Sequence, residues 1–293
     1  MAKTFQVGDL TVTLVVESEF PVLTPSEVYP DATAEDIDKN EAWLAPRFYD
    51  RISEKLILSF QGFLIRSEGK NILVDTCVGD CKDRRRPSFD QKKWRWLDQL
   101  MAEGCEPEQV DIVVCTHFHV DHVGWNTQRV DGTWQPTFPN ARYLFVKKEW
   151  DYWLSGEGAH NINRTGDYME DSILPVVEAG LVDFVETDHR IDPCVSLKPA
   201  PGHTPGMVCV DLQSKDSHAI IAGDLLHTIL QVIHPSWSTR FCADPVLSRD
   251  TRKAFLERYA NTDVMILPAH FPSPTAGYIE HDSNGFSYRF VDE

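Results

Sequence analysis

Hydrophobic positions form short runs with the spacing of strands and helices along most of the chain. Residues 56–66 and 71–75 are β-rich runs separated by Ser67-Glu68-Gly69-Lys70, which predicts a hairpin. Residues 110–115 are almost all apolar, as expected of a strand buried on both faces. Similar runs predict further strands at 142–146, 195–197, 207–212, 219–222 and 264–267.

Helical spacing occurs in three segments between these strands. Residues 91–103 carry apolar side chains at helical spacing and end before a glycine, a suitable C-terminal cap. Residues 168–179 predict a second helix, and residues 248–260 a third that opens at Ser248 or Asp250. Helices that alternate with strands in this way indicate an α/β protein.

The N-terminal region has a weaker pattern, because residues 21–50 show no clear periodicity. The length of 293 residues allows one large α/β domain. We interpret residues 1–50 as an N-terminal strand and arm that belong to the same domain as residues 51–293. An arm of this length can wrap around a neighbour, which is compatible with a homodimer but does not decide the oligomeric state.

The charge of the chain limits its partners. A formal net charge of −17 argues against a nucleic-acid-binding protein, because affinity for phosphate backbones comes largely from clustered lysine and arginine. The one basic cluster spans residues 82–86, with Lys92 and Lys93 close behind. We expect a solvated loop there rather than a site for an anion or a partner.

Apolar stretches of the sequence are short. No apolar stretch approaches the roughly 18 residues of a membrane span, and the start of the chain lacks the apolar core of a secretory signal. We therefore expect a cytoplasmic protein with no membrane partner. Its seven cysteines are expected to be reduced thiols.

Residues with metal chemistry are concentrated in the loop after the strand at 110–115. Residues 116–122 read Thr-His-Phe-His-Val-Asp-His, and no packing pattern requires three imidazoles and a carboxylate in so few positions. Imidazole nitrogen is a suitable ligand for Zn(II). The spacing lets His117 and His119 face one metal while Asp121 and His122 face a second.

Three further candidates lie at other strand ends, as two zinc ions with about three protein ligands each and a bridge require. His203 lies in the loop Ala-Pro-Gly-His-Thr-Pro-Gly, where proline and glycine can aim one side chain rigidly. Asp224 follows an apolar run, and its two oxygens can bridge both metals. His270 completes the set. Because loops at one edge of a sheet commonly form the site of an α/β protein, we predict that these strand ends meet.

The order His-x-His-x-Asp-His, Gly-His-Thr-Pro-Gly, Gly-Asp and a final histidine resembles the metallo-β-lactamase superfamily over residues 56–272. The resemblance implies a four-layer αββα sandwich with a dimetal site at one edge. It also implies that Asp75 orients a ligand, and Cys77 stands where the family usually has glycine. It assigns His117, His119 and His203 to the first zinc, Asp121, His122 and His270 to the second, and Asp224 to both.

Residues 120–126, 139–143 and 269–272 look most similar to the branch with N-acyl-homoserine lactonases and methyl-parathion-hydrolase-like enzymes. We therefore expect two Zn(II) per chain and a hydrolase that cleaves a lactone or carboxylic ester through a metal-bridging hydroxide. Asp121 is the candidate that passes on a proton. The alternatives are a phosphotriesterase and a thioester hydrolase of the glyoxalase II type.

Aromatic residues near the motifs are candidates for a substrate pocket. The residues near the motif loops that could line an apolar pocket are Trp125, Trp153, Phe271, His227, His234 and Trp237, and the aromatic ones suit the core equally well. His227 and His234 are expected to be surface or supporting groups, because the set of seven ligands is already complete. We expect neutral esters to be preferred over phosphotriesters, because the sequence shows no basic surface that would hold phosphate.

Overall fold

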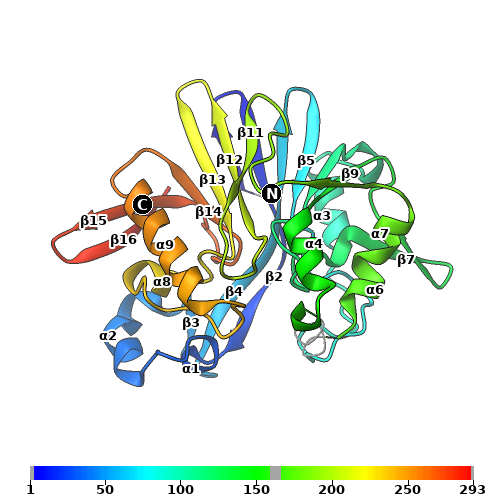
Figure 1. The fold of residues 1–293 in the computed structure, drawn as a ribbon. Helices are drawn as coiled ribbons and strands as arrows, with labels where there is room; N and C mark the ends of the chain where they lie inside the picture. Colours follow the sequence, from blue (N-terminus) through cyan, green and yellow to red (C-terminus); the bar gives the residue numbers. More distant parts are fainter. Residues whose placement is uncertain (1–2, 159–165, 292–293) are drawn as a thin grey trace.

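Two β-sheets lie against each other at the centre of the molecule, with helices on both sides (Figure 1). The computed structural model describes residues 3–158 and 166–291. The first sheet has the order β1 (Thr4–Val7), β2 (Leu10–Leu23), β4 (Lys55–Ser67), β5 (Lys70–Val74), β6 (Ile112–Val114), β9 (Arg142–Val146) and β10 (Val182–Val185), with β3 (Tyr49–Asp50) paired to β4. The second has the order β11 (Val195–Pro199), β12 (Val208–Ser214), β13 (Ser217–Gly223), β14 (Met265–Pro268), β15 (Gly277–Asp282) and β16 (Gly285–Phe290).

Each sheet combines antiparallel hairpins with parallel strands near the place where the predicted ligands follow. Strands β5, β6, β9 and β10 pair in parallel, as do β13 and β14. The carboxyl ends of parallel strands lie at the same edge of a sheet, which brings the loops that follow them together. A separate small hairpin consists of β7 (Thr127–Val130) and β8 (Thr133–Pro136).

Helices cover the outer face of each sheet (Figure 1). The first sheet is covered by α3 (Trp96–Ala102), α4 (Lys147–Trp153), α6 (Tyr168–Ser172) and α7 (Leu174–Glu178). The second is covered by α1 (Pro25–Val28), α2 (Ala34–Leu44), α8 (Leu230–Ile233) and α9 (Pro245–Tyr259). The 3₁₀ turn η1 (Pro107–Gln109) precedes β6, and the 3₁₀ turn η2 (Gly124–Asn126) ends the loop that follows β6.

The core has three apolar layers, because successive strand residues point to opposite faces. In β5, Leu73 packs outward under the helices, while Ile72 and Val74 pack between the sheets. In β13, Ile220 packs outward and Ile221 packs between the sheets. Helices, sheet, sheet and helices thus form four layers, and the predicted αββα sandwich is confirmed.

The segment 21–50 packs against its own chain. Its helices α1 and α2 place Val28, Ile37 and Leu44 in the apolar layer outside the second sheet. The Tyr29 hydroxyl lies 2.8 Å from the Thr228 hydroxyl, which ties the segment to the loop before α8. These apolar positions do not repeat with one period, because two short helices and a strand share the segment.

Three helix predictions need correction, two at the start of the helix and one in its interior. The helix predicted at 91–103 begins only at Trp96, because Arg95 has a left-handed backbone (φ 58°) and Asp80 accepts a hydrogen bond of 2.6 Å from the Trp94 amide. The helix predicted at 168–179 is interrupted between α6 and α7, where Pro175 cannot donate a helical hydrogen bond.

The helix predicted at 248–260 begins earlier than expected, at Pro245. Neither Ser248 nor Asp250 is its cap. The Asp244 side chain accepts a hydrogen bond of 2.9 Å from the Leu247 amide, and proline at the first helical position costs no hydrogen bond.

The basic cluster is also different from the solvated loop that we expected. Lys82 and Arg84 are buried. Arg84 donates to both carboxylate oxygens of Asp171, at 2.6 and 2.9 Å, and Lys82 donates to the Thr127 hydroxyl at 2.6 Å. The carboxylate compensates for the cost of burying the cations.

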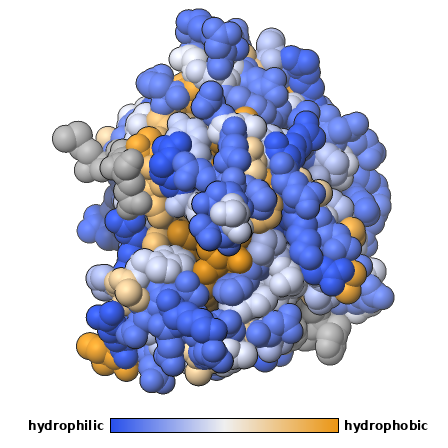
Figure 2. Space-filling view, turned by 90° about the vertical axis from the view of Figure 1, so that its left-hand side faces the viewer, coloured by the Kyte–Doolittle hydropathy of each residue, from blue (hydrophilic) through white to orange (hydrophobic). Residues whose placement is uncertain are grey.

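The surface is mostly hydrophilic on the face drawn in Figure 2, where hydrophobic residues gather in a patch near the centre. This agrees with the net charge of −17. Among the helices of residues 3–158 and 166–291, none is long and apolar enough to cross a membrane.

Candidate metal centre

The seven predicted ligands come together at one edge of the two sheets, on the loops that follow β6, β11, β13 and β14. They form two clusters, and the ligand atoms within each cluster lie within 4.8 Å of one another. The first cluster contains His117, His119, His203 and Asp224, and the second contains Asp121, His122 and His270.

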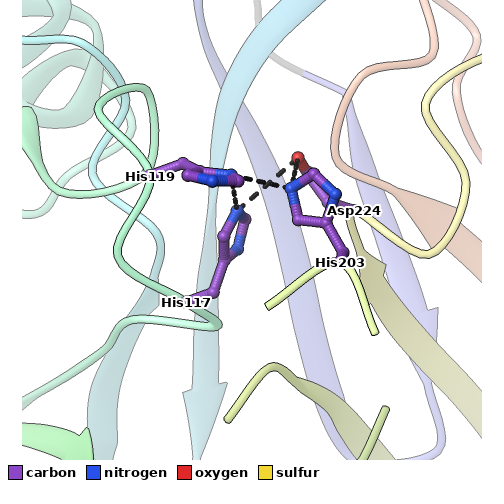
Figure 3. A group of neighbouring side chains, drawn as sticks. All are labelled: His117, His119, His203 and Asp224. Atoms are coloured by element: carbon purple, nitrogen blue, oxygen red, sulfur yellow. Dashed lines mark hydrogen bonds and ion pairs between the residues drawn. The ribbon is translucent and has the colours of Figure 1, made fainter. Parts of the chain in front are cut away.

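In the first cluster, three imidazoles converge on one carboxylate oxygen (Figure 3). His119 Nδ1 lies 3.0 Å from His117 Nε2 and 2.7 Å from His203 Nε2. Asp224 Oδ2 lies 3.6 Å from His117 Nε2 and 3.1 Å from His203 Nε2. Ligands of a tetrahedral zinc ion, with bonds of about 2.0 to 2.1 Å, lie about 3.4 Å apart. The spacing therefore fits a shared metal ion.

In the second cluster, the other oxygen of Asp224 meets two further imidazoles. Asp224 Oδ1 lies 3.1 Å from His122 Nε2 and 3.0 Å from His270 Nε2. Asp121 is somewhat farther away, with an oxygen 3.8 Å from His270 Nε2. Although buried, His122 Nε2 and Asp224 Oδ1 have no hydrogen-bond partner among the described residues. Buried nitrogen and oxygen atoms without a hydrogen-bond partner are expected where a metal ion binds them in place of a hydrogen.

The ring of His122 is oriented from behind by Asp75. One Asp75 oxygen lies 2.8 Å from His122 Nδ1, and the carboxylate also accepts hydrogen bonds from the Thr116 amide and hydroxyl. This contact turns Nε2 toward the cluster, as expected for Asp75. Cys77 has a left-handed backbone (φ 49°), so it keeps the conformation that a glycine at this position would favour.

Glu149 joins the ligand loops of the two sheets. Its buried carboxylate accepts hydrogen bonds from the Phe118 amide at 3.0 Å, the Gly206 amide at 3.0 Å and the Trp153 indole at 2.6 Å. Phe118 lies between two ligands of the first sheet, and Gly206 follows His203 in the second. The positions of the two loops are therefore coupled.

The electrostatics of the clusters favour a cation. Burial lowers the pKa of His117 and His119 well below the usual range, which keeps both imidazoles in the neutral form that binds metal. Burial would raise the pKa of Asp224, but the surrounding imidazoles, led by His122, hold it well below its usual range. Burial also opposes protonation of His122, yet Asp224 and Asp75 raise its pKa. A bound metal cation would experience the same attraction.

Residues 62–270 match the Metallo-beta-lactamase superfamily. The chain belongs to this superfamily. The resemblance inferred from the sequence is thereby confirmed.

Curated relatives within the superfamily include N-acyl homoserine lactonases. The chain is 23% identical to N-acyl homoserine lactonase AiiA of Bacillus thuringiensis subsp. kurstaki over 171 residues, which are 54% of this chain and 60% of that protein. It is 24% identical to an N-acyl homoserine lactonase of Bacillus sp. over 180 residues, 57% of this chain and 64% of that protein. The chain thus matches less than two thirds of the length of these relatives.

Solved structures of the superfamily share the fold over almost the whole chain. AidC, described as a dizinc quorum-quenching lactonase in complex with a product, has a TM-score of 0.81, 21% identity and coverage of 99% of this chain and 97% of AidC. The hydrolase AbOPH has a TM-score of 0.82, 22% identity and the same coverage. At this identity the likeness establishes the fold.

A cavity of about 370 Å³ is lined by residues of both clusters. Its floor consists of ligands from both clusters together with His227. Apolar side chains form most of its walls, and Arg85 and Arg86 form a cationic side. The apolar wall residues are Val22, Leu23, Val28, Leu58, Phe60, Phe89, Val120, Trp153 and Phe241.

The aromatic candidates have different roles. Trp153 lines the cavity. Trp125 instead belongs to the core, where its indole donates to Glu17 at 2.8 Å, and Phe271 packs against Tyr288 with ring centroids 5.2 Å apart. The cavity walls come largely from segments without a motif, such as Phe60 in β4.

His227 was a candidate for the pocket but not for the ligand set, and it does line the cavity. Its Nε2 lies 3.1 Å from Asp224 Oδ2, and burial lowers its pKa to about 4. Neither ring nitrogen has a hydrogen-bond partner in the part of the chain that the structure describes. Its position three residues after Asp224 was the available signal. His234 is half-buried and stacks on Trp237 instead.

The sequence indicated no basic surface that would hold phosphate, but two arginines lie at the cavity. Arg85 and Arg86 belong to the basic cluster that we expected to be solvated, and both line the cavity. The burial of Lys82 and Arg84 anchors this part of the loop, which carries the next two arginines to the cavity.

Proposed function

We propose that this chain is a dinuclear zinc hydrolase that cleaves a lactone or carboxylic ester. The observation that carries the proposal is the position of Asp224, which presents one oxygen to each ligand cluster. Five imidazoles and two carboxylates are a donor set that suits zinc. Two zinc ions, when bound, supply a hydroxide nucleophile near neutral pH and a Lewis acid for a carbonyl oxygen.

The protein groups around the centre have roles of their own. Asp224 holds the two clusters together, and Asp75 and Ser59 fix the rings of His122 and His270 from behind through contacts of 2.8 and 2.9 Å. Asp121 lines the cavity and is partly exposed, which supports assigning it the transfer of a proton to the departing alkoxide.

The apolar cavity supports a substrate with an apolar part beside its reacting carbonyl. Its walls remove water from the reacting group, which strengthens electrostatic interactions at the floor. The relatives named N-acyl homoserine lactonases favour a lactone among the possible esters.

The test combines metal analysis with a substrate panel. We expect about two equivalents of zinc per chain, loss of turnover with a strong chelator and recovery when zinc is returned. An acyl-homoserine lactone, an aromatic lactone and p-nitrophenyl esters would be compared with a phosphotriester and a β-lactam. We expect kcat/KM for a lactone or ester to be at least about tenfold higher, about 1.4 kcal/mol in the transition state.

Two outcomes would count against the proposal in different ways. Full activity of metal-free protein would rule out the dinuclear mechanism. A phosphotriester as the best substrate would overturn the substrate class while leaving the metal centre in place.

A further inference from the structure

Arg86 provides a half-buried positive charge on one side of the cavity. Its guanidinium carbon lies 5.2 Å from the centre of the Phe89 ring. Across residues 3–158 and 166–291, no hydrogen bond or ion pair joins this guanidinium to another group. Asp121 and Glu27 attract its charge only from a distance. A cation in this setting lacks the carboxylate partner that buried arginines usually have.

The backbone around Arg86 is held in place. Its carbonyl accepts hydrogen bonds from the Phe89 amide at 2.9 Å and the Asp90 amide at 3.0 Å. Two residues earlier, Arg84 is paired through both nitrogens with Asp171. The guanidinium therefore starts from a fixed loop, which lowers the entropy cost of binding a ligand.

A wall of aromatic rings connects this cation with the metal centre. The Phe89 ring meets Phe60 edge-on at 5.1 Å, and Phe60 meets His270 edge-on at 5.3 Å. Phe60 and Phe89 both line the cavity. A ligand along this wall would have its reacting carbonyl at the His270 end and another group at the Arg86 end.

Carboxylate is the group that suits the Arg86 end. Burial lowers the pKa of Arg86, but a guanidinium stays protonated at neutral pH, and its planar fork pairs with carboxylate through two hydrogen bonds. We propose that the preferred substrate is a lactone or ester that carries a carboxylate apart from the scissile bond, and that Arg86 binds this carboxylate. The inference rests on the proposed hydrolase function and narrows its substrate.

The experiment uses zinc-loaded protein and a matched pair of substrates, a lactone with a ring carboxylate and the same lactone with a neutral carboxamide. We expect wild-type kcat/KM to favour the carboxylate by about tenfold or more. Arg86→Met should reduce this preference to about onefold, with kcat/KM for the carboxamide changed less than about threefold. Arg86→Lys should keep part of the preference, because it keeps the charge but not the fork.

Arg258→Met is the matched control, because Arg258 lies over the Tyr259 ring at 5.4 Å but is exposed and does not line the cavity. It should leave the preference unchanged. Binding is measured in parallel with tetrahydrofuran carboxylate and carboxamide, which have no lactone or ester bond. Arg86→Met should weaken binding of the carboxylate alone.

The outcomes separate this inference from the proposed function. If neither lactone is hydrolysed, the proposed function fails. If both are hydrolysed equally well by the wild type, the function stands and the role of Arg86 is wrong. A carboxylate preference that survives in Arg86→Met would place the anion on the metal centre and would also overturn the inference.

Discussion

The floor of the cavity and its cationic side are held in different ways. At the floor, the rings of His122 and His270 are positioned from behind by the Asp75 carboxylate and the Ser59 carbonyl, and their other nitrogens face Asp224. At the cationic side, a buried ion pair between Arg84 and Asp171 fixes the backbone. The Arg86 guanidinium itself makes no hydrogen bond or ion pair within the described residues. At the floor the side chains themselves are held in position, whereas at the cationic side only the backbone of the loop is held.

This difference indicates a division of labour. Metal chemistry tolerates little displacement, because ligands must lie within a few tenths of an ångström of their positions. A charged group that recognises part of a substrate can tolerate more movement. Substitutions at the floor should therefore affect metal and turnover, whereas substitutions that loosen the loop should affect stability.

The largest expected effect is at the bridging position of the floor. Asp224→Ala removes both oxygens that join the clusters, so bound zinc should fall from about two equivalents to below one. We expect kcat/KM to fall at least about a thousandfold, near 4 kcal/mol. His270→Ala should empty mainly one site, and metal analysis distinguishes the two. Identical losses of one equivalent in both variants would contradict the bridging role.

The second effect concerns the anchor of the cationic side. Asp171→Asn leaves Lys82 and Arg84 buried without a carboxylate, so the free energy of unfolding should fall by about 3 kcal/mol. Asp183→Asn breaks a similar but exposed pair with Arg142 and should cost less than about 1 kcal/mol. Urea unfolding of both variants tests this. Equal losses would mean that the loop does not depend on its buried pair.

The smallest effect lies at Glu17, which connects the two regions. Its carboxylate accepts hydrogen bonds from the Gly79 amide, at the start of the basic loop, and from the Trp125 indole, at the end of the ligand loop. Burial raises the pKa of Glu17 from 4.5 to about 8, despite the backbone hydrogen bonds that oppose it.

Between these pH values, folded protein keeps a proton that unfolded protein has released, so the free energy of unfolding falls as pH rises. The loss is at most about 1.4 kcal/mol per pH unit and ends above the folded pKa. Glu17→Gln cannot ionise, so relative to this variant the wild type should lose about 2 kcal/mol of unfolding free energy from about pH 6 to 7.5. Urea unfolding at both pH values that gives a constant difference would contradict this.

Local sequence patterns were sufficient to predict a feature where the residues that determine it are close in the sequence. The strand at 142–146 was predicted with the ends observed for β9, because its apolar run is bounded by polar segments. The ligand clusters could be expected from the spacing of His117 to His122 and from strand ends. Neither prediction depended on a contact between residues that are far apart in the sequence.

Other features depend on distant partners. The burial of Arg84 follows from Asp171, which is 87 positions away. Trp125 lies beside the ligands in sequence, but its indole turns away from the cavity toward Glu17, 108 positions away. The periodicity of a sequence shows which residues are apolar. It does not show which carboxylate, far away in the sequence, will accept a hydrogen bond from an arginine or an indole.

The division of the ligands between the sheets has a consequence for how the protein assembles. His117, His119, Asp121 and His122 follow a strand of the first sheet, whereas His203, Asp224 and His270 follow strands of the second. Each cluster draws on both sheets, so an ion held there acts as a cross-link that closes a long chain segment. Full affinity for the metal can arise only after the two sheets have packed together. The free energy of metal binding then adds to the free energy that holds the two sheets together.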